Sequence, residues 1–323
     1  MKIAVVGCGH WGKNLVRNFS ELGALAAACD CNPHSISYLK ANYSNIKIYN
    51  DFEELIKDSS INGIVIATPS GTHYKLAKQS LLAGKNVYVE KPLAKNLKEA
   101  EELQAIALDS DLTLMVGHLL LYHPAVNKLK SLIASGELGT IQYVNSDRRN
   151  FTRDHRRDSN VMWDLAPHDF SMMTYLLSAE PEEITSVRGW SSNDDGIVDV
   201  AHIDLIFPNN IGGHIHNSWL DPQKQALLTV NGSKKTAVLN DTFKENKLEI
   251  YSRNDEGSIT VEKPAYSNDE PLRLECKHFL ECIQHKQVPT TDGINGLQVV
   301  NYLEQCQEML QAGSTQEVLA VHS

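Results

Sequence analysis

The chain has 323 residues, and this length predicts two domains at roughly 150 residues each. Apolar residues make up 42% of the chain and charged residues 22%, which excludes a wholly disordered protein. The 40 acidic and 30 basic residues give a net charge of −10, which argues against a nucleic-acid polymer or an anionic membrane as partner.

The start of the chain and its cysteines predict a cytoplasmic location and no membrane partner. The first apolar run ends at Gly7, too early for a signal peptide, and no stretch reaches the roughly 20 apolar residues of a membrane span. None of the six cysteines forms a Cys-x-x-Cys pair, so we expect buried, reduced thiols.

Residues 2–118 alternate short apolar runs with helical patterns. Strands are predicted at 2–6, 24–29, 63–67, 86–89 and 112–116. Helices are predicted at 10–22, from Pro33 onward, and at 72–83 and 97–108. This alternation is typical of an α/β fold with a doubly wound parallel sheet, which binds ligands at the carboxyl ends of its strands.

After about residue 140 the pattern changes to runs of strands with tight turns. Strands are predicted at 140–147, 183–190, 198–207, 213–219, 226–231, 235–240 and 247–251. Helices are predicted at 159–177, 271–285 and 295–312. We therefore expect domains at 1–118 and 119–323, the second an α+β domain with a largely antiparallel or mixed sheet.

The turn Gly7-Cys8-Gly9-His10-Trp11-Gly12 lies between a predicted strand and a predicted helix. In this G-x-G-x-x-G pattern the glycines allow a tight turn, close approach of a pyrophosphate, and close packing of helix on strand. Asp30 ends the second strand, where a carboxylate accepts hydrogen bonds from a ribose and repels a 2′-phosphate. The pattern predicts a site for NAD rather than NADP.

Glu90-Lys91-Pro92 follows the strand at 86–89, at the edge where the crevice is expected. Lys91 could stabilise negative charge or relay a proton there, although a surface ion pair is the simpler interpretation of so short a motif.

Asp164 and His168 are four residues apart on a predicted helix and share one face. The aspartate could orient the histidine as a base for an alcohol proton. A metal site would need a further ligand, which we cannot identify, and the pair could also be structural.

These motifs together resemble the Gfo/Idh/MocA family of oxidoreductases over essentially the whole chain. The resemblance rests on the glycine turn, on Ala67-Thr68-Pro69-Ser70 with His73, on Glu90-Lys91-Pro92, and on Asp164 with His168. It implies a Rossmann domain, an open-faced α/β domain whose sheet often mediates oligomers, and hence a homodimer or homotetramer. It also implies Lys91 and His168 as catalytic residues, steadied by Asp164.

By the same resemblance, cofactor contacts fall at the ends of the strands of the first domain. The implied cofactor residues are Gly7, Gly9, His10, Trp11, Gly12, Asp30, Thr68, Pro69, Ser70, His73, Glu90, Lys91 and His118. The expected substrate residues are Lys91, Tyr122, Arg148, Arg149, Asn150, Asp164 and His168. Many relatives carry an arginine where this chain has Leu121, which puts one substrate contact in doubt.

Within the family, the chain is most similar to sugar-nucleotide 3-dehydrogenases of surface-polysaccharide pathways. The similar segments are WGKNLVRNF at 11–19, VMWDLAPHDFSMM at 161–173, SWLDPQK at 218–224 and EPLRLECKHFLECI at 270–283.

Residues 148–157, with sequence RRNFTRDHRR, hold five arginines. Arginine forks suit the oxygens of a diphosphate or a carboxylate, whereas charge runs are also common on solvated loops and at oligomer contacts.

His214 and His216 share a face of one predicted strand, and His202 lies on the preceding strand. Polar residues on a sheet face are the favoured interpretation, and we expect no metal.

The sequence therefore predicts an NAD-dependent dehydrogenase that oxidises a secondary hydroxyl, at C3, of a nucleotide-linked sugar such as a UDP-N-acetylhexosamine or its uronic acid. A dehydrogenase of a free sugar or inositol, an NAD-using glycosidase and a non-enzymatic NAD-sensing protein stay open as alternatives. Whether Lys91 or His168 is the proton acceptor also stays open.

Overall fold

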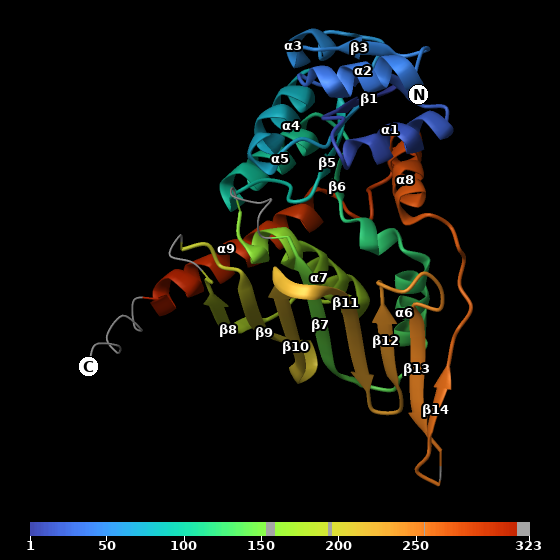
Figure 1. Cartoon of the computed structure of the whole chain (residues 1–323), viewed down its shortest axis with the longest axis vertical. Coiled ribbons are helices and arrows are strands. Elements are labelled where there is room, and N and C mark those ends of the chain that lie inside the picture. The colour runs from blue at the N-terminus through green and yellow to red at the C-terminus, as the bar shows by residue number, and fades with distance from the viewer. Residues whose placement is uncertain (153–158, 193–195, 255, 315–323) are drawn as a thin grey trace. The chain divides into compact units, whose positions relative to one another are not determined.

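The computed structural model describes residues 1–152, 159–192, 196–254 and 256–314 (Figure 1). The chain divides into two compact units, each built from two separate segments. The first unit comprises Met1–Tyr122 and Asp269–Asn301, and the second comprises His123–Asn268 and the chain from Tyr302 onward. Residues 269–301 thus pack with the first unit, although they follow the second in the sequence.

The first unit contains a parallel six-stranded sheet in the order β3-β2-β1-β4-β5-β6. Its strands are β1 (Ile3–Val6), β2 (Leu25–Cys29), β3 (Lys47–Tyr49), β4 (Gly63–Ile66), β5 (Asn86–Glu90) and β6 (Leu114–Gly117). The doubly wound parallel sheet predicted from the sequence is confirmed. The short strand β3 was not predicted, since three residues carry too little periodicity.

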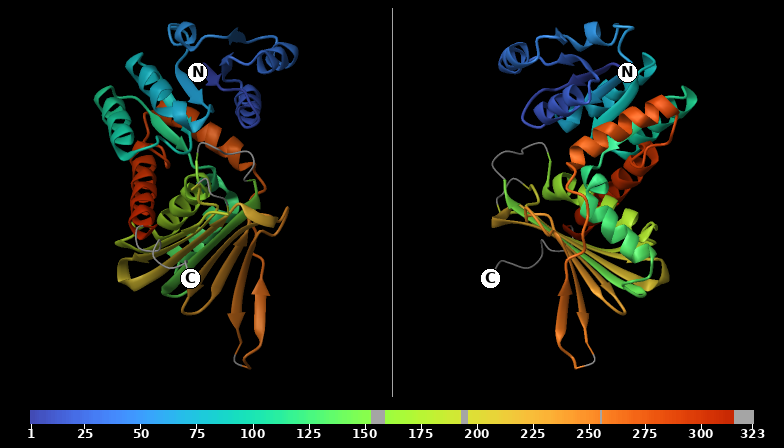
Figure 2. Two further views of the ribbon diagram at one scale, coloured as in Figure 1. Left: turned by 60° about the vertical axis from the view of Figure 1, so that its left-hand side comes forward. Right: turned by 90° about the vertical axis from the view of Figure 1, so that its right-hand side faces the viewer.

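Helices cover both faces of this sheet (Figure 2). They are α1 (Gly12–Glu21), α2 (Pro33–Asn42), α3 (Phe52–Leu55), α4 (His73–Leu82) and α5 (Leu97–Asp109). Because the strand order runs one way from β1 to β3 and the other way from β4 to β6, right-handed crossovers place α1 and α4 on opposite faces. The carboxyl ends of β1 and β4 are therefore neighbours at the point where the order reverses.

Helix α8 (Pro271–His285) completes the first unit by packing beside α1. The Phe279 ring lies edge-on to Phe19 of α1 and to Tyr88 of β5, with centroids 6.4 and 5.8 Å away. Phe279, Phe19 and Tyr88 are fully buried, so this apolar contact holds the later segment on the sheet.

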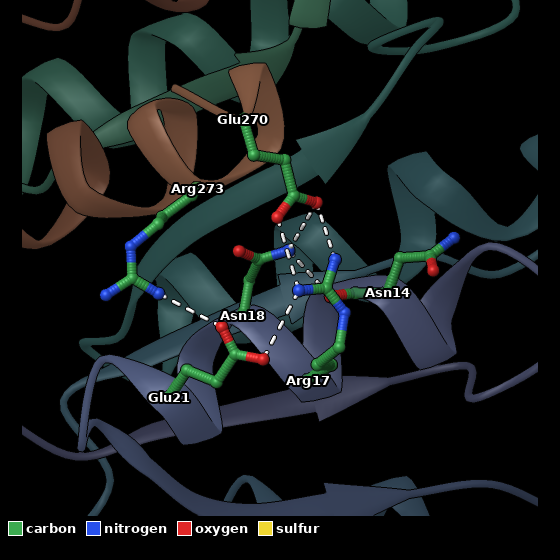
Figure 3. Close-up of polar contacts among 6 residues, drawn as sticks. All are labelled: Asn14, Arg17, Asn18, Glu21, Glu270 and Arg273. Carbon is green, nitrogen blue, oxygen red and sulfur yellow. Dashed lines mark hydrogen bonds and ion pairs between the residues drawn. The ribbon is translucent and has the colours of Figure 1, made fainter. Parts of the chain in front are cut away.

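A polar network joins the same two helices (Figure 3). The Arg17 guanidinium donates to both carboxyl oxygens of Glu270, at 3.2 and 2.5 Å, and the buried Asn18 amide donates to Glu270 as well. Arg273 and Arg17 both bond to Glu21. The Arg17 guanidinium lowers the pKa of Glu270, which lies at the N-cap position of α8 without a side-chain capping bond.

The second unit contains a mixed eight-stranded sheet in the order β14-β13-β12-β11-β7-β10-β9-β8, counted over the described residues. Its strands are β7 (Ile141–Phe151), β8 (Glu183–Trp190), β9 (Val200–Phe207), β10 (Ile211–Ser218), β11 (Leu220–Gly232), β12 (Thr236–Asn240), β13 (Leu248–Arg253) and β14 (Ile259–Glu262). Among the described strands of this sheet, only β7 and β10 pair in parallel. The predicted largely antiparallel sheet is confirmed, but β14 was not predicted.

Helices α6 (Pro124–Ala134) and α7 (Val161–Leu177) pack together and contact this sheet. Along β9 every second residue is buried, so one face of the sheet is covered and the other carries partly exposed side chains. The described part of the chain ends with helix α9 (Gly293–Ser314). Within the described residues, no helix has both the length and the hydropathy needed to cross a bilayer.

One helix was not predicted, and one expectation about a cysteine was wrong. Helix α6 was not predicted, although Pro124 at its first position and the His123 side chain, which accepts from the Ala125 amide, are ordinary start signals. Cys31 is exposed, because β2 ends at Cys29. The other cysteines are free and buried as expected: Cys8, Cys29, Cys276, Cys282 and Cys306.

We predict that Glu270→Gln destabilises the protein by about 1 kcal/mol at pH 7, since a partly exposed, bidentate ion pair is worth roughly that much. Arg17 lowers the Glu270 pKa, so this contribution is present at neutral pH and is lost as the pH falls below the ordinary glutamate pKa of about 4.3. Urea unfolding of the variant and the wild type across this pH range measures it. Arg273→Gln is the control, because its contact with Glu21 is more exposed; an equal loss in both variants would contradict the prediction.

Candidate functional site

The turn between β1 and α1 has the conformation that the glycine pattern requires. Gly7 has φ of +85°, a region that suits glycine. A Cβ atom at Gly12 would lie 1.8 Å from the Gly7 carbonyl oxygen, so the helix can pack this closely only without a side chain. A Cβ at Gly9, by contrast, would meet no atom within 4 Å, so nothing in the fold itself requires glycine at that position.

Asp30 closes this turn from the end of β2. Its carboxylate accepts hydrogen bonds from the Cys8 amide and from the Asn32 amide, both at 2.7 Å. The two bonds hold the carboxylate beside the glycine turn, where the sequence predicted a ribose contact. No side chain caps the start of α1 at Trp11, and the first turn of α1 contains no acidic residue. Gly9, Asp30 and the uncapped helix end thus fit a dinucleotide, whose pyrophosphate would take the helix N-terminus.

The loop after β4 is tied to the loop after β5 by one buried histidine. The ring nitrogens of His73 lie 2.9 Å from the Thr68 carbonyl and 2.8 Å from the Pro92 carbonyl. Burial lowers the His73 pKa. Each ring nitrogen faces a backbone carbonyl oxygen, which supports a positioning role for His73 rather than the expected contact with the cofactor.

Thr68, Pro69 and Ser70 form the turn that leads into α4. The Thr68 and Thr72 hydroxyls lie 2.7 Å apart, and Thr72 also donates to the Pro69 carbonyl. This loop lies after β4, next to the glycine turn after β1.

Glu90 ends β5 and reaches the glycine turn. The Trp11 indole nitrogen donates to the Glu90 carboxyl at 2.6 Å, and the Tyr88 hydroxyl donates to the same oxygen at 3.1 Å. Desolvation raises the Glu90 pKa, whereas these two hydrogen bonds act to lower it. The next residue, Lys91, precedes Pro92 through a cis peptide bond. The hydrogen bond between Trp11 and Glu90 thus joins two expected cofactor residues. His10, the neighbour of Trp11 in the sequence, is exposed.

His118, just past β6, is buried without a hydrogen bond to its ring. Neither ring nitrogen has a hydrogen-bond partner in the described part of the chain. Burial, and to a lesser degree the charge of Lys91, lower the His118 pKa to about 3, so the ring is neutral at pH 7. A buried polar group without a partner costs about 1–3 kcal/mol. This cost supports a role in ligand contact for His118.

Tyr122 does not have the setting expected of a substrate residue. Its hydroxyl lies 2.9 Å from the Thr291 hydroxyl, its ring contacts His278, and the side chain is buried. Burial raises the Tyr122 pKa. These contacts argue for a structural role within the first unit.

In the second unit, α7 holds Asp164 and His168. The Asn160 side chain caps the helix by accepting from the Trp163 amide. Asp164 is buried and accepts a hydrogen bond of 3.1 Å from the Trp219 indole, while His168 is partly exposed on the same helix. Trp219 was not predicted as a site residue, although it lies in the quoted segment 218–224 and could have been found there.

Arg148 is engaged by a buried acid on α7. Its guanidinium nitrogen lies 3.0 Å from a carboxyl oxygen of Asp169, which is fully buried and also accepts from Ser146 and Asn217. This pair supports a structural role for Arg148, because removing the arginine would leave the buried Asp169 charge uncompensated.

Arg149 is directed away from Arg148, since successive side chains of a strand alternate. It pairs with Asp147 at 2.7 Å and with Asp221 at 2.8 Å. Asn150 accepts from the Thr152 hydroxyl. Arg148–Phe151 belong to β7 rather than to a loop after it, and residues 153–157 of the arginine-rich segment lie outside the described residues. Arg148 and Arg149, the described arginines of this segment, are therefore each paired with acidic side chains.

The three strand histidines do share one sheet face. His202 stacks on His216 with ring centroids 4.2 Å apart, and its ring nitrogen lies 3.3 Å from that of His214. His214 and His216 contact Asp204 and Asp147 respectively. Over the described residues, no group of three or more histidine, cysteine, aspartate or glutamate side chains is arranged to hold a metal ion.

The β3-β2-β1-β4-β5-β6 sheet, the glycine turn and Asp30 define a dinucleotide-binding protein with a Rossmann fold. Residues 1–118 match the model of the oxidoreductase family with an NAD-binding Rossmann fold, and residues 126–238 match the GFO/IDH/MocA C-terminal domain. The chain belongs to the Gfo/Idh/MocA family of oxidoreductases, and its cofactor is NAD. Membership of this family favours an enzyme over the non-enzymatic NAD-sensing alternative.

Relatives of the chain differ in their substrates. A UDP-N-acetylglucosamine 3-dehydrogenase of Acidithiobacillus ferrooxidans is 24% identical, over 93% of this chain and 94% of the relative. An NAD-dependent scyllo-inositol 2-dehydrogenase of Bacillus subtilis is 25% identical, over 91% and 90%. The solved structure of the A. ferrooxidans 3-dehydrogenase GnnA has a TM-score of 0.85 at 23% identity, over 97% of this chain and 98% of that one, which shows the shared fold.

We predict that two alanine substitutions in the glycine turn affect different properties, one the stability of the protein and the other its affinity for NAD. Gly12→Ala should destabilise the protein by about 3 kcal/mol, because its Cβ would collide with the Gly7 carbonyl oxygen. Gly9→Ala should change stability by less than about 0.5 kcal/mol, since its Cβ meets open space, but should weaken NAD binding at least about tenfold by blocking the pyrophosphate. Thermal unfolding and calorimetric titration with NAD measure the two effects. Unchanged NAD affinity in Gly9→Ala would exclude this turn as the pyrophosphate site.

Proposed function

We propose that the protein is an NAD-dependent dehydrogenase that oxidises a secondary hydroxyl, at C3, of a nucleotide-linked sugar such as a UDP-N-acetylhexosamine or its uronic acid. The product is a 3-keto sugar, and its biological context would be surface-polysaccharide biosynthesis. Support comes from the four similar sequence segments and from the 3-dehydrogenase relative that aligns over nearly the whole chain.

The observation that carries the proposal is the bond between Trp219 and Asp164. It connects two of the segments that resemble sugar-nucleotide 3-dehydrogenases, 161–173 on α7 and 218–224 around the start of β11. The indole donates to a buried carboxylate on the helix that also carries His168, and so holds Asp164 in place. A cluster of this kind suits the orientation of a catalytic histidine.

The proposed roles follow from the chemistry of the side chains. His168 takes the proton of the substrate hydroxyl, and Lys91 stabilises the developing alkoxide or relays the proton. NAD, when bound, accepts the hydride from the carbinol carbon. One hydroxyl proton and one hydride leave the substrate, so the reaction yields a ketone, NADH and a proton.

A polyol dehydrogenase is the second candidate, and one observation favours it. Arg148 and Arg149 are each paired with carboxylates, which leaves neither as an obvious ligand for a diphosphate. An uncharged polyol such as an inositol needs no such ligand, and an inositol dehydrogenase is as similar to the chain as the sugar-nucleotide enzyme.

We further propose that the protein acts in the cytoplasm as a homo-oligomer, a dimer or a tetramer. Its free cysteines suit a reducing compartment. The partly exposed face of the eight-stranded sheet would supply the contact between copies.

We predict that UDP-N-acetylglucosamine or its uronic acid supports NADH formation with kcat/KM at least about tenfold above that of N-acetylglucosamine or an inositol, equal to about 1.4 kcal/mol of transition-state binding. Absorbance of NADH across a panel of UDP-sugars, dTDP-sugars and free polyols measures this, after bound cofactor has been removed. Faster turnover of an inositol would favour the polyol candidate. Release of a free sugar without net NADH would indicate the NAD-using glycosidase.

We predict that Lys91→Ala and His168→Ala each lower kcat by about 10²–10⁴-fold while NAD binding changes little, since each removes a group that acts on the proton or alkoxide. Lys91→Arg keeps the positive charge, so partial recovery in this variant would assign Lys91 an electrostatic role. His34→Ala, at an exposed histidine on α2, is the control. Normal turnover in both alanine variants would contradict the proposed mechanism.

A further inference from the structure

His118, the residue that follows β6, is a buried histidine whose ring has no partner. Only 1% of the residue is exposed, and neither ring nitrogen makes a hydrogen bond within the described part of the chain. Buried polar side chains are usually hydrogen-bonded, because an unsatisfied one has lost its water without a replacement. His73, equally buried in the same unit, shows the usual arrangement, with ring nitrogens 2.8 and 2.9 Å from carbonyl oxygens. The ring of His118 therefore needs an explanation.

The backbone at His118 is held in place by its own hydrogen bonds. The His118 amide donates to the Val116 carbonyl at 2.8 Å, and the His118 carbonyl accepts from the Leu121 amide at 3.0 Å. The outer edge of β6 is held as well, since the Val116 amide donates to the Thr291 carbonyl at 2.8 Å. These bonds engage the main-chain groups of His118, so the ring is the part of the residue that stays available for a ligand. A side chain on so well fixed a backbone suits precise recognition.

The order of the strands relates His118 to the nicotinamide half of the cofactor. Asp30 at the end of β2 fits the adenosine ribose, and the uncapped start of α1 fits the pyrophosphate. The rest of a dinucleotide then extends over the carboxyl ends of β4, β5 and β6. Gly117 pairs with Glu90 in the register of β6 and β5. His118 and Lys91, the next residue on each strand, therefore leave the sheet side by side at this edge.

The chemistry of the ring limits which group it can bind. A neutral imidazole has one N–H donor and one nitrogen acceptor. Burial lowers the pKa of His118 to about 3, so the ring is neutral at pH 7. The carboxamide of nicotinamide carries a carbonyl oxygen that accepts and an NH₂ group that donates, so it can satisfy either ring nitrogen. A neutral ring also places no positive charge beside the positively charged nicotinamide of NAD⁺.

We propose that His118 binds the cofactor through a hydrogen bond to the carboxamide of the nicotinamide. This bond would restrict rotation of the nicotinamide about its bond to the ribose, and so would determine which face of the ring meets the substrate. The inference rests on NAD binding and not on the proposed sugar substrate, so the two can fail separately.

The test is calorimetric titration of the full-length protein with NAD⁺, NADH and ADP-ribose, without substrate. ADP-ribose keeps both riboses and the diphosphate but lacks the nicotinamide. We expect His118→Leu to weaken binding of NAD⁺ and of NADH about tenfold, and to change ADP-ribose affinity by less than about twofold, since only the carboxamide contact is lost. The loss should be equal for the two cofactors, because they share the carboxamide and differ in ring charge.

Each other result for His118→Leu would overturn the proposal. Equal losses for all three ligands would assign His118 to the ribose or to the structure of the site. A loss for NAD⁺ alone would indicate an effect of charge. Unchanged affinities would show that His118 binds no part of the cofactor and that an ordered water or the substrate satisfies its ring.

Two amide variants test whether hydrogen bonding is the cause. The side chains in His118→Asn and His118→Gln each keep a donor and an acceptor, near the positions of Nδ1 and Nε2 respectively. At least one of them should recover part of the NAD⁺ affinity lost in His118→Leu. If neither binds NAD⁺ more tightly than His118→Leu does, the proposal is wrong. His285→Leu, at an exposed histidine that ends α8, is the control and should bind all three ligands as the wild type does.

Thermal unfolding without cofactor separates a ligand role from a structural one. His118→Leu removes a buried polar group that has no partner, so its melting temperature should rise by about 2–4 °C. His73→Leu removes an equally buried ring with two partners, so its melting temperature should fall. A lower melting temperature in His118→Leu, together with equal losses of NAD⁺ and ADP-ribose affinity, would make His118 a structural residue and overturn the proposal.

Discussion

The hydrogen bond between the Trp11 indole and the Glu90 carboxyl is the contact on which the cofactor-binding unit depends. It joins the turn after β1 to the end of β5, two strands away in the sheet. Glu90 directly precedes Lys91 and Pro92, and the Pro92 carbonyl is bound to His73 in the loop after β4. A continuous set of polar contacts therefore links three loops at the carboxyl edge. The same contacts hold Trp11 and Glu90, two expected cofactor residues, next to the proposed catalytic residue Lys91.

Helix α8 shows why the first unit needs a segment from late in the sequence. Glu270 at its start binds Arg17 on the helix of the glycine turn, and Phe279, further along α8, packs edge-on against Tyr88. The first contact is a partly exposed ion pair between two helices, whereas the second is a buried aromatic contact with the sheet. One helix thus contacts both α1, which follows the glycine turn, and β5, which ends at Glu90.

In the second unit, buried acids organise the region that the sequence marked for substrate. Asp169 neutralises Arg148 inside the unit, and Asp164 is held by Trp219. Arg149 points to the other face of β7, where it meets further acids. Counting arginines in a segment therefore overstated the positive charge that a ligand would meet, because alternation along a strand sends neighbouring arginines to different partners.

Local patterns in the sequence by themselves determined the doubly wound sheet, the glycine turn with Asp30, and the placement of Asp164 and His168 on one helix. These features depend on spacing within a few residues, which hydrophobic period and turn chemistry record directly. The short elements β3, α3 and β14 carry too few residues for such a period. The Trp219–Asp164 bond, the pairing of Arg148 with the buried Asp169, and the packing of Phe279 against Tyr88 were decided by the tertiary structure alone, because each joins residues from different elements. Whether a charged side chain is a ligand, an ion-pair partner or a neutral buried acid depends on those neighbours and on the loss of water around them.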